Sequence, residues 1–157
     1  MRIFMYPFMF MAAAGFVISL AAHVMALAGI KPPGGGLVWL LHVGVFVVWF
    51  PAIVFGNRKF KTLDRKADWL KTLEPCPAWM RRILKLAFAY AIVNFILFFG
   101  TTMGQPKPTG AAPPSVVRGF SGHWMVFYWA AYVTLYAGIK TRRLEASSTA
   151  VNESRRD

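Results

Sequence analysis

The chain of 157 residues is strongly apolar and strongly basic. Apolar residues make up 57% of it and aromatic residues 16%, while 18 Lys and Arg against 6 Asp and Glu give a formal charge of +12. An ordinary soluble domain carries less apolar surface than this. The single cysteine excludes a disulfide framework within the chain. Composition therefore argues against a soluble globular domain and indicates one compact membrane-embedded unit.

Four apolar windows are long enough to cross a bilayer, because a spanning helix needs about 20 residues. They cover residues 3–30, 36–55, 83–103 and 119–139. Lys85 is the one charged residue inside them, and it lies near enough to a helix end to extend toward water. The first window is roughly twice as long as a signal-peptide core, so we expect it to be retained as a helix. The sequence predicts an all-α fold, a four-transmembrane-helix bundle occupying residues 1–143.

The basic residues are distributed unevenly between the two sides of this bundle. Of the 18 Lys and Arg, three lie in the first and third loops, at Lys31, Lys107 and Arg118, and the other 15 lie on the opposite side with all six acidic residues. Cytoplasmic loops are enriched in Lys and Arg, so both termini are predicted to be cytoplasmic, in the inner (plasma) membrane of a bacterium. The positive charge is expected to face anionic lipid. Nucleic acid is not expected as a partner, since no recognition motif accompanies the charge.

The long cytoplasmic connection, residues 57–82, alternates basic residues with apolar ones at helical spacing. The apolar positions are Phe60, Leu63, Ala67, Leu70 and Leu73. This spacing predicts an amphipathic helix that lies on the inner leaflet, with its leucines at the acyl boundary. Cys76 is expected to be an inert loop thiol, the Pro-rich outer segment 104–119 a semi-extended cap, and the polar tail 144–157 disordered.

All three histidines fall in one layer of the predicted bundle. His23, His42 and His123 lie roughly 10, 9 and 6 Å below the outer boundary, at a rise of 1.5 Å per residue. Each belongs to a different span. Ionisable residues inside a membrane are rare and usually face the bundle interior, so the layer is a candidate site.

Helical spacing predicts what surrounds each histidine. The first span carries a stripe of small residues that lets another backbone or a flat ligand approach: Ala12, Gly15, Ser19, Ala22, His23 and Ala26. The second carries an aromatic wall of Trp39, His42, Phe46 and Trp49, and the fourth a face of Gly119, His123, Phe127, Ala130 and Thr134. The third span contributes Tyr90, Asn94 and Thr101, which are expected to point inward because a buried polar group needs a partner.

One interpretation of the layer is a single b-type haem. Its axial ligands would be His42 and His123, with His23 flanking the porphyrin and Arg118, together with Lys31 and Lys107, facing the propionates. Without a carboxylate nearby, the second nitrogen of each ligand is expected to donate to a backbone carbonyl or to a hydroxyl such as that of Thr101 or Ser19. This interpretation predicts a small redox or quinone-linked cytochrome subunit.

Two other interpretations remain open. The same imidazoles could hold copper or zinc, His23, His42 and His123 being joined by a soft ligand from Met25, Met103 or Met125. Alternatively each histidine hydrogen-bonds a neighbouring helix and no cofactor binds, as in a non-catalytic scaffold or accessory subunit of a larger membrane complex. No acidic residue lies on the outer side to orient a histidine, so conventional hydrolytic chemistry is not predicted.

Overall fold

The computed structural model describes residues 4–60, 72–102 and 112–155, and within these ranges the chain is helical with no strand. In chain order the elements are α1 (Met5–Leu27), the short 3-10 helix η1 (Gly35–Trp39), α2 (Leu40–Phe60), α4 (Ala78–Thr102) and α5 (Pro114–Glu153). The all-α fold predicted from the sequence is confirmed. Between α1 and η1 the backbone takes positive φ at Gly29, Gly34 and Gly35, conformations that glycine adopts without steric cost.

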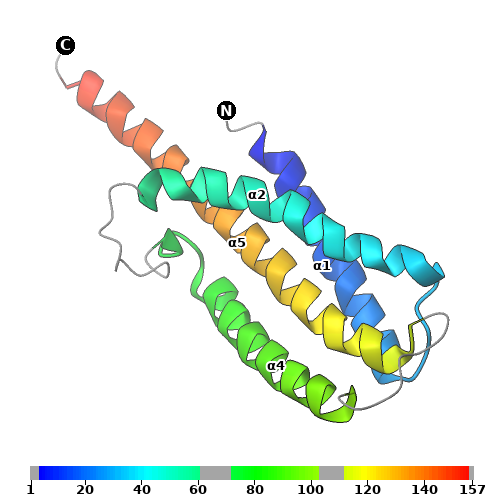
Figure 1. Cartoon of the computed structure of the whole chain (residues 1–157). Helices are drawn as coiled ribbons and strands as arrows, with labels where there is room; N and C mark the ends of the chain where they lie inside the picture. Colours follow the sequence, from blue (N-terminus) through cyan, green and yellow to red (C-terminus); the bar gives the residue numbers. More distant parts are fainter. Residues whose placement is uncertain (1–3, 61–71, 103–111, 156–157) are drawn as a thin grey trace.

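Helix α5 is the centre of the bundle. It packs against α1 along the longest contact and also against α2 and α4, so the other three helices surround it (Figure 1). Of the residues from Gly119 to Ile139, only Phe127 is exposed. The first described residues of α1 and the far end of α5 lie at the same end of the bundle (Figure 1).

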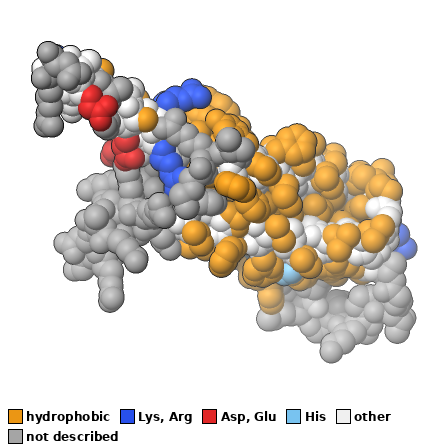
Figure 2. Space-filling view, turned by 90° about the horizontal axis from the view of Figure 1, so that it is seen from above, with side chains coloured by type: hydrophobic (Ala, Val, Ile, Leu, Met, Phe, Trp, Pro, Cys, Tyr) orange, Lys and Arg blue, Asp and Glu red, His pale blue; other side chains and the backbone are white. Residues whose placement is uncertain are grey.

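Three segments are long and apolar enough to cross a membrane: Met5–Leu27, Gly35–Val54 and Ala78–Thr102. Large apolar side chains cover the outside of the described bundle, while charged side chains gather toward its ends (Figure 2). These segments correspond to the first three predicted spans. The fourth predicted span, residues 119–139 in the part of the chain that forms the last described helix, is not among these segments, so the four-span bundle stays a prediction.

The small-residue stripe of the first span is confirmed as the buried face of α1. Its buried residues are Met5, Ala12, Gly15, Ser19, Ala22, His23 and Ala26. At Gly15 a side chain would collide with the ring of Tyr128, whose hydroxyl donates a 2.8 Å hydrogen bond to the Leu41 carbonyl. The absence of side chains at Gly15 and Gly44 therefore lets one tyrosine lie between α1 and α2.

The connection before α4 differs from the prediction. Leu73 was expected at the lipid boundary but is 1% exposed and packs in a cluster with Met80, Leu84 and Val133, so it belongs to the bundle core. The amphipathic pattern did not distinguish burial against lipid from burial against α5. Leu63 and Leu70, the other leucines of the predicted interfacial helix, lie outside the described residues.

The two ends of α5 also differ from the prediction. The helix begins at Pro114, inside the segment predicted to be extended, because proline is well accommodated in a first helical turn. It continues to Glu153, through most of the tail predicted to be disordered. Good helix formers such as Leu144, Glu145 and Ala146 propagate a helix that the bundle has already nucleated.

Cys76 packs into the same cluster as Leu73 and is 3% exposed. Removal from water raises the pKa of its thiol to about 11, while the cations of Lys140 and Arg81 oppose this shift. The reactive thiolate is therefore scarce at pH 8. We expect a maleimide to label Cys76 slowly in the folded protein at pH 8 and at least tenfold faster after denaturation in SDS. Equal rates in the two states would contradict the burial of this thiol.

Candidate functional site

The structure divides the three histidines between two environments. His23 lies in a polar cluster between α1, α4 and α5, whereas His42 and His123 line one groove between α2, α4 and α5. Among the described residues, no three His, Cys, Asp or Glu side chains lie close enough together to hold a metal ion. The three imidazoles therefore do not form one cluster, although the sequence predicted that they lie at a common depth.

The polar cluster satisfies both ring nitrogens of His23, which is 3% exposed. Its Nδ1 lies 2.8 Å from the Ser121 hydroxyl, and its Nε2 is hydrogen-bonded to the Tyr90 hydroxyl. Ser121 in turn donates to the Arg118 carbonyl at 3.2 Å, which leaves its oxygen as the acceptor from Nδ1–H. A neutral His23 then accepts from Tyr90 at Nε2. His23 is thereby fully occupied in joining three helices.

Asn94 extends this cluster along α4. It is 5% exposed, and its Nδ2 donates to the carbonyls of Arg118 and Gly119 at 3.1 and 3.3 Å. A Cβ at Gly122 would lie 2.6 Å from that nitrogen, so glycine is required for the amide to approach. The prediction that Asn94 points into the bundle is confirmed. Asn94 and His23 are therefore both buried with hydrogen-bond partners, as polar groups away from water require.

The groove that holds the other two histidines has a volume of about 450 Å³ and an aromatic lining. It is lined by His42, Val45, Phe46, Trp49, Ile53, Phe95, Phe120, His123, Trp124 and Phe127. The predicted aromatic wall of α2 supplies Phe46 and Trp49. Sequence reasoning missed Phe120 and Trp124, although their four-residue spacing beside His123 is the signal that places them on one side of α5.

The hydrogen bond between Trp124 and His42 determines the proton position on His42. The indole Nε1–H donates to Nδ1 of His42 at 3.1 Å. Indole is a donor only, so Nδ1 must be an unprotonated acceptor. His42 is therefore neutral in this arrangement, and its proton is on Nε2. The ring presents a hydrogen-bond donor at that second nitrogen.

The opposite assignment holds for His123. Its Nδ1 lies 3.0 Å from the Gly119 carbonyl, which only accepts, so the proton is on Nδ1. In the neutral ring, Nε2 then carries a lone pair. The edge of the ring also contacts Phe95 at a centroid distance of 4.6 Å and an interplanar angle of 78°. One groove thus contains two imidazoles of opposite hydrogen-bonding character.

The remaining predicted site residues lie elsewhere. Arg118 is half-buried, and its Nε has no hydrogen-bond partner among the described residues, while its carbonyl belongs to the polar cluster. Met125 is buried, and Met25 lines a different groove. Met103 and Lys107 lie outside the described residues.

Thr101 and Ser19, the hydroxyl residues predicted to bond the histidines, do not bond them in the structure. Thr101 is exposed and donates back to the Leu97 and Phe98 carbonyls of its own helix, so its prediction as an inward-facing residue is wrong. Ser19 is buried, but its hydroxyl has no hydrogen-bond partner within the described chain. A threonine in a helix can bond the backbone of its own helix, and for this reason helical spacing alone did not predict that Thr101 faces outward.

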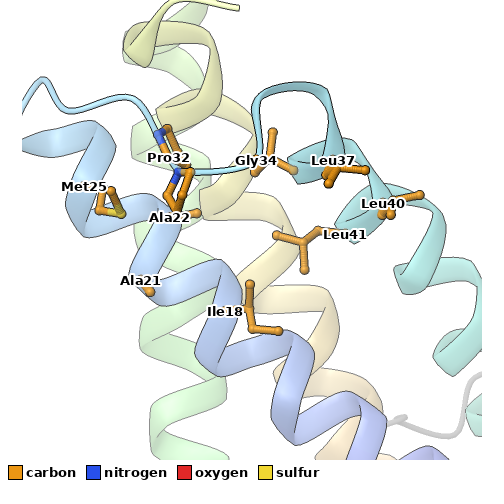
Figure 3. Close-up of a pocket in the computed structure, with 11 residues that line it drawn as sticks. Ile18, Ala21, Ala22, Met25, Pro32, Gly34, Leu37, Leu40 and Leu41 are labelled. Carbon is orange, nitrogen blue, oxygen red and sulfur yellow. The ribbon is translucent and has the colours of Figure 1, made fainter.

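A second groove, of about 430 Å³, lies between α1 and the η1–α2 segment, beneath the connection that joins α1 to η1 (Figure 3). Ile18, Ala22 and Leu41 line it together with Pro32, and every side chain in the lining is apolar (Figure 3). It offers dispersion contacts and no side-chain hydrogen bond. The histidine groove is therefore the stronger candidate for a specific ligand, since orientation and specificity come from a few polar groups in an apolar site.

These features define a small helical membrane protein with one polar cluster and one aromatic groove. Its three apolar helices and apolar exterior favour contact with the lipid bilayer. Comparison with known proteins adds no relative: no family model, no curated protein and no solved structure matches the chain.

Proposed function

We propose that this chain is a four-span membrane protein that binds a quinol-type ligand, a flat lipid-soluble ring with hydroxyl or carbonyl oxygens, in the histidine groove. The observation that carries the proposal is that His42, assigned an Nε2–H donor, and His123, assigned an Nε2 acceptor, both line one aromatic groove. The groove surface itself is almost wholly apolar, so both rings must turn to present these nitrogens to a ligand. A quinol hydroxyl can accept from the first and donate to the second.

The position of the groove supports a ligand that arrives through the bilayer. His42, Phe46 and Phe127 line the groove and are also exposed on the outside of the bundle. Figure 2 shows a histidine side chain at the surface among apolar side chains. In a membrane these side chains contact lipid, so a lipid-soluble ring reaches the histidines laterally.

The proposal is tested by binding of a tailless probe, tetramethylbenzoquinol, to the protein in lipid nanodiscs under anaerobic conditions. His42→Phe and His123→Phe are each expected to weaken binding about threefold to tenfold, because a hydrogen bond contributes about 0.5–1.5 kcal/mol. Tryptophan fluorescence is a direct readout, since Trp49 and Trp124 line the groove.

The matched control is Met25→Ala, in the apolar groove, which should leave the affinity unchanged. Wild-type binding no stronger than partition into protein-free nanodiscs would overturn the proposal. That outcome would favour the scaffold interpretation, in which the histidines only hold helices together.

A haem held by His42 and His123 is the second candidate, because the two rings come from different helices and line one groove. Ligation through Nε2 of His42 would require its proton to move to Nδ1 and the Trp124 hydrogen bond to break. Trp124→Phe is therefore expected to strengthen haem binding if haem is the ligand, and to weaken a quinol that depends on the present tautomer. The measurements are the low-spin haem absorbance of the purified protein and the quinol affinity. Absorbance that disappears in His42→Ala and His123→Ala would establish haem instead.

The topology part of the proposal places both termini in the cytoplasm, on the basis of the 15 to 3 division of Lys and Arg. A reporter fused after Asp157 is expected to behave as cytoplasmic, and one inserted at Gly110 as external. Labelling of a cysteine introduced at Gly110 by a membrane-impermeant reagent checks this in intact cells or spheroplasts. Labelling only after the membrane is opened would contradict the orientation.

A further inference from the structure

A smaller groove of about 200 Å³ continues from the histidine groove along the seam between α4 and α5. The two grooves share three lining residues: Phe95, His123 and Phe127. The smaller groove adds apolar side chains, among them Phe88, Ala91 and Val126. His123 thus lies at the junction of a groove with two imidazoles and a groove whose other lining side chains are all apolar.

The direction of the smaller groove is given by the two antiparallel helices. On α4 it runs from Phe95 back to Phe88, and on α5 it runs forward from His123 to Phe127. Both directions lead away from the C-terminal end of α4 and the N-terminal end of α5, and seven residues of α4 correspond to roughly 10 Å along the axis. In the four-span arrangement, the groove therefore leads from the histidine layer toward the middle of the bilayer.

We propose that this smaller groove binds the first part of an isoprenoid tail, so that the ligand of the chain is a prenylated quinol. The inference rests on the proposed function, because it needs the ring to lie beside His42 and His123. The continuity of the two grooves gives the tail a path that starts at the ring. Apart from His123 the lining is apolar, which favours an apolar substituent, since burying a polar one without a partner is unfavourable. The remainder of the tail extends into lipid.

Ile92→Trp separates tail binding from ring binding. Ile92 lines the smaller groove and is 59% exposed, so a larger side chain there fills the groove without entering the core. The matched control is Val93→Trp, at the next position of α4, which is 55% exposed and not in the lining of either groove. The two probes are tetramethylbenzoquinol and the corresponding trimethylbenzoquinol carrying a tail of two isoprene units. Both are measured in nanodiscs and corrected for partition into protein-free nanodiscs.

We expect Ile92→Trp to weaken the prenylated probe about tenfold and to leave the tailless probe within twofold of wild type, while Val93→Trp changes neither. Equal affinities of Ile92→Trp and wild type for the prenylated probe would overturn the tail assignment and leave the ring site intact. Equal weakening of both probes by Ile92→Trp would also overturn it, because the substitution would then act on the ring groove. If neither probe binds the wild type, the proposed function fails and this inference fails with it.

Discussion

Replacing Gly15 with alanine is expected to lower the free energy of unfolding by about 1–3 kcal/mol, the range found for an extra methyl group in a well-packed core. The added Cβ would come closer than 3.0 Å to carbons of the Tyr128 ring. That ring cannot simply move away, because its hydroxyl is bonded to the Leu41 carbonyl and lies against Gly44 on α2. Separation of α1 from α5 is the remaining way to relieve the contact. Unfolding in mixed micelles of increasing SDS content measures the change.

Gly100→Ala is the matched control, since a Cβ at this helical glycine meets nothing within 4 Å. Alanine has the higher helix propensity, so this variant should be as stable as wild type or slightly more stable. Gly15→Ala should cost less free energy of unfolding in a Tyr128→Leu background than in the wild type, because the ring that meets the new methyl group is then absent. A Gly15→Ala variant as stable as Gly100→Ala would show that Tyr128 does not occupy the gap between the helices.

His23→Ala is expected mainly to lower stability, and His42→Ala is expected mainly to weaken ligand binding. Removing the His23 ring leaves the Tyr90 and Ser121 hydroxyls without a shared partner and opens a cavity beneath α5, at a cost of about 1–3 kcal/mol. The His42 ring is exposed and its removal opens no buried cavity, but it takes away the acceptor of the buried Trp124 indole, so a smaller cost of about 0.5–1.5 kcal/mol is expected. Quinol affinity should instead fall in His42→Ala and stay within twofold of wild type in His23→Ala.

SDS unfolding and probe binding, measured on the same samples, distinguish the two roles. Tyr90→Phe provides a milder test of the cluster, because it removes one hydrogen bond to His23 and keeps the ring. It should cost about 0.5–1.5 kcal/mol. Loss of quinol binding in His23→Ala with unchanged stability would contradict the assignment of His23 to the bundle core.

The sequence predicted a depth for each histidine, which stays a prediction, but it did not predict the direction in which each ring points. Depth depends only on residue count along a helix, whereas direction depends on how each helix is rotated against its neighbours. The α1 stripe was predictable because its small residues repeat at helical spacing and leave one face for packing. His23 belongs to that stripe and was predicted to flank a ligand held by His42 and His123, but in the structure it is bonded to Ser121 and Tyr90, away from the groove.

The partners of the histidines were not predictable from the same pattern. Trp124 bonds to His42 across 82 positions in the chain, and Ser121 bonds to His23 across 98, so both pairs depend on tertiary packing. The burial of Leu73 has the same origin, because an apolar stripe on a helix does not reveal whether lipid or α5 covers it. Residues 61–71, which contain three of the five apolar positions of the predicted interfacial helix, lie outside the described part of the chain, so the contact with anionic lipid stays a prediction.

The central place of α5 has a consequence for how the protein is made. Ribosomes synthesise α1, α2 and α4 before the helix against which all three pack, so these helices enter the membrane without their common partner. Until α5 arrives, His23 lacks the Ser121 hydroxyl and Asn94 lacks the Arg118 and Gly119 carbonyls. Polar groups left unpaired in hydrocarbon attract any available donor or acceptor. We therefore expect a nascent chain that ends after Thr102 to remain associated with the insertion machinery, and its release into lipid to coincide with synthesis of the last helix.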